Sequence, residues 1–175
     1  MDAEREIRVS RDKLNILRVG GLIKRGGLSF MDVVNLIPKD QYLQQRASHV
    51  LIHTLEYHKY EPSKKEIIAL TNLLKQKGMI EGAYRNILRT LDELDAYPEE
   101  VEGFLFDYCS TAMTNLTRPL AIRAFSIPIA FKIGVKYPDL LKELRELLHG
   151  IAEEDGVSVQ SRKRDYLKRI DKLLP

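Results

Sequence analysis

An arginine recurs at nearly constant spacing through this chain. Arg46, Arg85, Arg123 and Arg162 are separated by 39, 38 and 39 residues. A Tyr-Pro break recurs as well, because Tyr97-Pro98 lies 40 residues before Tyr137-Pro138. A period of about 40 residues with two amphipathic segments in each unit is typical of an α-solenoid. The spacing therefore predicts an all-α right-handed superhelix of antiparallel helix pairs.

The repeat divides the chain into successive units of one predicted domain, 1–175. We place these units at roughly 1–40, 41–78, 79–116 and 117–156, and we expect a terminal helix over 158–174. In the first unit, Leu14 and Leu17 predict one helix from about Ala3 to Lys24. Later, Ser63 and Glu66 have the spacing of a capping box that opens a helix.

Composition agrees with one well-packed domain. The chain has 175 residues, of which 44% are hydrophobic, and this is enough for a sizeable core. Apolar runs are broken before the roughly 20 residues that a bilayer requires, and the amino end resembles no signal peptide. We therefore expect a cytoplasmic protein without membrane contact. Cys109 is the single cysteine, which excludes an internal disulfide.

Charge is distributed unevenly along the chain. Residues 61–117 carry 10 acidic and 6 basic side chains, whereas 118–175 carry 8 acidic and 12 basic ones. One acidic stretch contains Asp92, Glu93, Asp95, Glu99, Glu100, Glu102 and Asp107. One interpretation is a solvated corner between two helices, where glutamates near a helix start are favourable. The alternative is a docking patch for a basic protein or peptide.

Two histidines lie one helical turn apart in the second unit. His49 and His53 are followed by Glu56, and this pattern can chelate a metal from a single helix. A preorganised site needs a further ligand, and the remaining candidate, His149, is about two repeats away. We therefore interpret His49 and His53 as solvated or groove-lining residues, which in the second case can contact a partner, and we predict no metal site.

No catalytic or cofactor-binding group can be assembled from the sequence. The four histidines are scattered, and Cys109 lies on an apolar stripe among acidic neighbours, which disfavours a thiolate. We therefore predict a protein that is not an enzyme and that needs no cofactor.

The segments around the recurring arginines resemble HEAT repeats. The resemblance is strongest over 117–174, where Arg118-Pro119-Leu120-Ala121-Ile122-Arg123-Ala124 is followed by Pro138-Asp139-Leu140-Leu141 and Val157-Ser158-Val159-Gln160-Ser161-Arg162. In HEAT repeats an arginine near the start of the second helix joins a ladder of contacts between neighbouring units. The resemblance implies this structural role for Arg46, Arg85, Arg123 and Arg162.

The carboxyl-terminal half also resembles small bacterial HEAT-repeat proteins, some of which are labelled adenylosuccinate lyase. Such lyases carry a Ser-Ser-x-Met-Pro catalytic loop, and this sequence contains no Ser-Ser pair.

The resemblance implies a non-catalytic scaffold for protein–protein interaction. Its partner would be a protein or peptide, of basic character if it docks on the acidic stretch. The alternative is nucleic-acid binding, as in the HEAT-like DNA alkylation-repair glycosylases that the fold resembles. The chain has no Trp and an acidic middle third, so we expect only weak, non-specific binding of nucleic acid.

Overall fold

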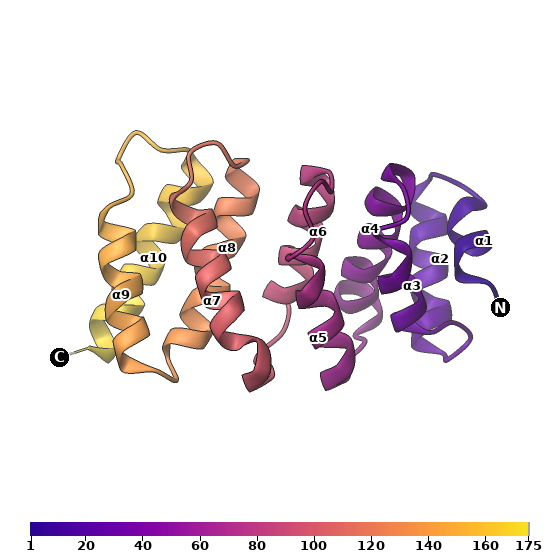
Figure 1. Ribbon diagram of the computed structural model, residues 1–175, viewed down its shortest axis with the longest axis horizontal. Helices are drawn as coiled ribbons and strands as arrows, with labels where there is room; N and C mark the ends of the chain where they lie inside the picture. The colour runs from indigo at the N-terminus through magenta and orange to yellow at the C-terminus, as the bar shows by residue number, and fades with distance from the viewer. Residues whose placement is uncertain (175) are drawn as a thin grey trace. The chain divides into compact units, whose positions relative to one another are not determined.

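The computed structural model describes residues 1–174 and folds them into α-helices, with no strand in that range (Figure 1). This confirms the predicted all-α solenoid class. The helices are α1 (Ala3–Arg8), α2 (Lys13–Lys24), α3 (Phe30–Leu36), α4 (Gln41–His58), α5 (Lys64–Leu73), α6 (Glu81–Asp92), α7 (Glu99–Thr114), α8 (Leu120–Gly134), α9 (Pro138–His149) and α10 (Val157–Leu173).

The helices group into two compact units, Met1–Glu93 and Leu94–Pro175. The boundary lies between α6 and α7, inside the predicted repeat 79–116. Each unit has its own buried core, so we describe them separately.

The amino-terminal unit consists of two rows of helices. In one row α2 packs against α4 and α4 against α6, while α3 packs against α5 in the other. Apolar residues such as Val19, Leu51 and Leu88 are fully buried in the first row, and Leu70 is fully buried in the second. Helix α1 packs against α2, α3 and α4 and covers the start of the rows.

The predicted helix over 3–24 is wrong in one respect, because it is divided into α1 and α2. The side chains of Ser10 and Asp12 form a local hydrogen bond of 2.5 Å, and Asp12 then accepts from the Asn15 amide at the start of α2. Asn15 is buried and donates to the carbonyls of Glu6 and Ser10. Short polar side chains thus favour a turn over a continuous helix. The register that results leaves Leu14 78% exposed.

Helix starts follow the local sequence where a capping residue is present. The capping box of Ser63 and Glu66 is confirmed, since the Ser63 hydroxyl accepts from the Glu66 amide while the Glu66 carboxylate accepts from the Ser63 amide. Ser29 accepts from the Asp32 amide in the same way and starts α3.

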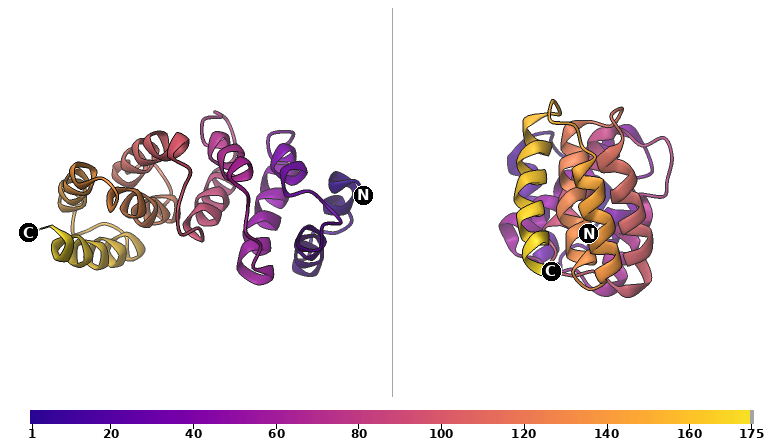
Figure 2. Two further views of the ribbon diagram at one scale, coloured as in Figure 1. Left: turned by 90° about the horizontal axis from the view of Figure 1, so that it is seen from below. Right: turned by 90° about the vertical axis from the view of Figure 1, so that its left-hand side faces the viewer.

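The carboxyl-terminal unit also has two rows, in which α8 packs against α10 and α7 against α9 (Figure 2). Ile127, Leu105 and Leu144 are completely buried between the rows. Helix α7 carries only acidic charges, whereas α10 carries six basic residues against Asp165 and Asp171. The two rows of this unit therefore differ in charge.

None of the helices in the described part of the chain has the combination of length and apolarity that crossing a bilayer requires.

Candidate functional site

The four recurring arginines lie on the corresponding row helices of their units but make different contacts. Arg123 on α8 is 2% exposed. It donates from Nη1 to Asp155 Oδ1 at 2.7 Å, from Nη2 to Asp155 Oδ2, and from Nε to the Met113 carbonyl at 3.1 Å. Its acidic partner lies in the loop that precedes α10. Arg123 therefore has a structural role between neighbouring helix pairs.

The other three arginines of the predicted ladder are partly exposed. Arg46 donates to the Arg11 carbonyl at 2.8 Å, and Arg85 approaches the side chain of the adjacent Asn86 at 3.3 Å. The Arg162 guanidinium lies 5.3 Å from the centre of the Phe125 ring. Equal spacing has placed these residues at equivalent helix positions without giving them equivalent partners.

The predicted acidic stretch is divided by the structure. Asp92 and Glu93 belong to the amino-terminal unit, whereas Asp95, Glu99 and Glu100 belong to the carboxyl-terminal unit. Except for Asp92, which is half-buried, these side chains are exposed.

Glu102 requires a correction, because it is only 3% exposed and cannot contribute to a docking patch. Its carboxylate accepts hydrogen bonds from Lys136 Nζ and, at 2.8 Å, from the Tyr137 hydroxyl. The side chain therefore joins α7 to the loop before α9.

A continuous stripe of polar and aromatic side chains runs along α4. We call it the α4 stripe and define it as Tyr42, Arg46, His49, His53 and Tyr57. Its members are half-buried or exposed, while the opposite face of α4 is buried in the core. Neighbouring rings are close together, with centroids 5.9 Å apart for His49 and His53 and 5.1 Å apart for His53 and Tyr57. Both histidines are half-buried, and 14% of the His53 side chain is exposed.

The sequence analysis missed both tyrosines of the α4 stripe. The signal was present, because residues 42, 46, 49, 53 and 57 are spaced by three or four positions and therefore share one helix face.

The two histidines of the α4 stripe are uncharged at neutral pH. Burial, together with His53 and the Arg85 and Arg46 guanidinium groups, lowers the pKa of His49 from 6.5 to about 4. Burial also lowers the pKa of His53, against the opposing effect of the Glu56 carboxylate. Neither Nδ1 atom has a hydrogen-bond partner among the residues described. Both Nδ1 atoms are buried, so the centre of the stripe offers a ligand uncharged ring surface rather than these nitrogens.

Basic side chains from the adjacent helices border the α4 stripe. Lys13 of α2 places its Nζ 5.4 Å from the centre of the Tyr57 ring. On the other side, Arg89 of α6 forms an ion pair with Glu56 and keeps 43% of its side chain exposed. Glu56 is the one carboxylate that α4 carries. The border is therefore predominantly cationic.

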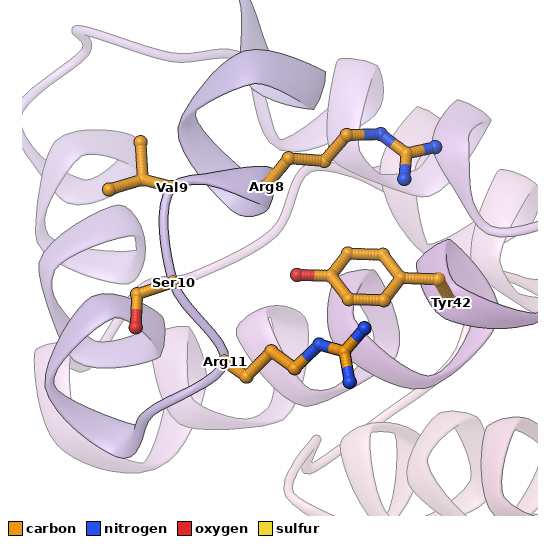
Figure 3. A pocket seen from close by; sticks show the side chains of 5 residues that line it. All are labelled: Arg8, Val9, Ser10, Arg11 and Tyr42. Carbon is orange, nitrogen blue, oxygen red and sulfur yellow. The ribbon is translucent and has the colours of Figure 1, made fainter.

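An open pocket of about 550 Å³ lies at the amino end of the α4 stripe (Figure 3). It is lined by Arg8, Val9, Ser10, Arg11 and Tyr42. The Arg8 and Arg11 guanidinium carbons lie 5.2 and 5.3 Å from the centre of the Tyr42 ring, a geometry typical of cation–π contacts. We call this the Arg-Tyr pocket.

The described residues contain no group of three His, Cys, Asp or Glu side chains positioned to hold a metal ion. His49, His53 and Glu56 share one side of α4, but the Glu56 carboxylate is paired with Arg89. The arrangement instead offers aromatic surface, uncharged imidazole rings and cations, and these suit non-covalent recognition.

Comparison with protein families gives one match, in which the model of the HEAT repeat domain covers residues 4–170. No curated protein and no solved structure matches the chain.

Proposed function

This chain belongs to the HEAT-repeat family, and we propose that it is a non-catalytic scaffold that binds an acidic segment of a partner protein on the α4 stripe. Stacked helix pairs typically offer extended binding surfaces of this kind. The observation that carries the proposal is the α4 stripe itself, a row of half-buried rings that ends in the exposed Tyr57 and has cations on both sides.

The dimensions of the α4 stripe suit a short extended peptide. Tyr42 and Tyr57 are 15 positions apart on one helix, which corresponds to roughly 22 Å at 1.5 Å per residue. An extended chain covers about 3.3 Å per residue, so about seven residues would span the stripe. Aromatic rings supply contact area at low entropic cost.

Charge favours an acidic segment. Three cations approach the α4 stripe from its two neighbouring helices, namely Lys13, Arg85 and Arg89. Against these positive charges, α4 carries one carboxylate, Glu56. Arginine recognises carboxylates through paired hydrogen bonds. We prefer this site to the acidic stretch of residues 92–102 because Glu102 is buried there and the remaining acids are divided between two units.

Nucleic acid is the second candidate ligand, and the basic helix α10 favours it. Arg162 and Arg169 lie over the Phe125 and Tyr166 rings, and such rings can stack with bases. Lys163, however, is buried and bonded to the Ile151 carbonyl. A nucleic-acid duplex carries one negative charge per roughly 1.7 Å, so a duplex on the α4 stripe would place a phosphate close to the Glu56 carboxylate. A peptide can instead place its carboxylates on either side of Glu56.

Fluorescence anisotropy with labelled peptides tests the proposal. We expect a Glu-Ala repeat of about eight residues to bind more tightly than the matching Lys-Ala repeat, and to bind less tightly as salt rises. Charge reversal by Lys13→Glu or Arg89→Glu should weaken the Glu-Ala peptide roughly tenfold. The matched control is Arg164→Glu, the same type of change at an exposed position of α10.

Equal weakening by Arg164→Glu would show that only net charge matters and would contradict the site. Tighter binding of the Lys-Ala peptide would support the acidic stretch instead. Sub-micromolar, sequence-selective duplex binding at roughly 150 mM salt would favour the nucleic-acid function, since we expect duplex affinities of about 10 μM or weaker.

A further inference from the structure

We propose that the Arg-Tyr pocket is a subsite for a phosphate monoester carried by the acidic segment that lies on the α4 stripe. This inference rests on the proposed function, because Tyr42 is both the first residue of the stripe and a wall of the pocket. A segment that follows α4 to its amino end therefore reaches the pocket.

The donors of the pocket are only partly used within the protein. Arg8 donates from Nε to Glu4 at 3.0 Å and from Nη2 to Asp40 at 2.6 Å, which leaves Nη1 uncommitted among the described residues. The Arg11 guanidinium lies over the Tyr42 ring and makes no ion pair with any described carboxylate. Figure 3 shows the Tyr42 hydroxyl directed toward the loop of Val9 and Ser10, with one guanidinium on each side of the ring.

The charge balance around the pocket favours an anion. Three carboxylates lie nearby and all are engaged: Glu4 by Arg8 and Lys39, Asp40 by Arg8, and Asp12 by the Ser10 hydroxyl and the Asn15 amide. The positive charge of Arg11 is left without a carboxylate partner, and Arg46 is held beside it by its 2.8 Å bond to the Arg11 carbonyl. An anion in the pocket therefore meets the unpaired charge of Arg11, while the carboxylates nearby are already bonded within the protein.

Phosphate fits these donors better than a carboxylate does. A phosphate monoester carries a charge of about −1.5 to −2 at neutral pH and offers three acceptor oxygens. Two guanidinium groups and a hydroxyl can satisfy all three, and arginine forks suit this geometry. A pocket of about 550 Å³ also has room for the side chain that carries the phosphate, since ligand pockets typically measure about 300–1,000 Å³.

The test compares the Glu-Ala peptide carrying serine at one end with the same peptide carrying phosphoserine, and it includes both choices of end. For each protein variant, the measured quantity is the dissociation constant of the serine peptide divided by that of the phosphoserine peptide. We expect phosphorylation at one of the two ends to tighten binding roughly tenfold, as new charge-assisted hydrogen bonds would. Arg11→Gln should bring this ratio to about one and Tyr42→Phe to about three. The control Arg164→Gln should leave it unchanged.

A ratio near one in the unaltered protein, with the unphosphorylated peptide still bound, would overturn the subsite and leave the proposed function intact. If neither peptide binds, the proposed function fails. In that case, calorimetric titration of the protein with phenyl phosphate tests whether the pocket binds a phosphate monoester without a peptide. Heat that disappears in Arg11→Gln would support phosphate recognition, and absence of heat would overturn it. Inorganic phosphate bound as tightly as the phosphopeptide would overturn the assignment to a peptide-borne group.

Discussion

Arg123 and Asp155 form a two-point ion pair that is almost completely withdrawn from solvent. The side chains are 3% and 6% exposed, and the two Nη atoms of Arg123 each bond one carboxylate oxygen of Asp155. The Nε atom bonds the Met113 carbonyl near the end of α7. One guanidinium therefore connects α7, α8 and the loop before α10.

We predict that Arg123→Ala destabilises the protein by about 3–5 kcal/mol, because a buried carboxylate and a buried carbonyl lose their donor. Arg85→Ala should cost about 1 kcal/mol, since Arg85 is half-exposed and its polar contacts are long. Chemical denaturation measures both values. The exposed Lys142→Ala is the control, with an expected effect below about 0.5 kcal/mol. Equal losses for Arg123→Ala and Lys142→Ala would show that the arginine spacing has no structural meaning.

The lowered pKa of His49 predicts that stability decreases in mild acid. The folded protein holds the pKa of His49 at about 4, below its ordinary value of 6.5. Between these values the unfolded chain binds the extra proton, so this contribution is complete above pH 6.5 and is lost as pH falls toward about 4. Denaturant titrations at successive pH values should show this decline. His49→Gln should flatten the profile across the same window, and an unchanged slope would contradict the assignment.

Glu102 should act on folding rather than on partner binding. Glu102→Ala removes the acceptor of the Lys136 and Tyr137 hydrogen bonds from a buried position, and we expect a loss of about 2 kcal/mol. Glu99→Ala, an exposed neighbour on the same helix, should change stability by less than about 0.5 kcal/mol. Thermal denaturation distinguishes the two variants. Similar melting temperatures would show that the buried carboxylate is dispensable.

Metal removal should leave the protein unchanged. His49 and His53 have no third ligand positioned to complete a site among the described residues. A structural metal contributes directly to the folding free energy, so its removal would lower the melting temperature. We expect EDTA to leave the melting temperature unchanged. Stoichiometric zinc in protein purified without added metal, detected by elemental analysis, would refute this.

Much of the architecture follows from patterns that are local in sequence. The apolar periodicity identifies the helices, and the side chains of Ser29 and Ser63 set the starts of α3 and α5 through bonds to amides three residues away. The sequence predicted one helix over 3–24, but a polar turn at Ser10 and Asp12 divides this segment into α1 and α2. The turn is held by the buried Asn15, whose side-chain amide donates to the carbonyls of Glu6 and Ser10.

The sequence by itself determined the repeat, the helical class and the positions of the recurring arginines, because a period of 38–39 residues is a property of the chain read in order. It also placed His49 and His53 one turn apart on the same side of one helix. Tertiary structure alone decided that Arg123 meets Asp155 while Arg162 meets Phe125, that Glu102 is buried, and that Arg8 and Arg11 flank Tyr42. These contacts join residues about 30–40 positions apart, so they depend on how neighbouring helices pack, and helical periodicity carries no information about that packing.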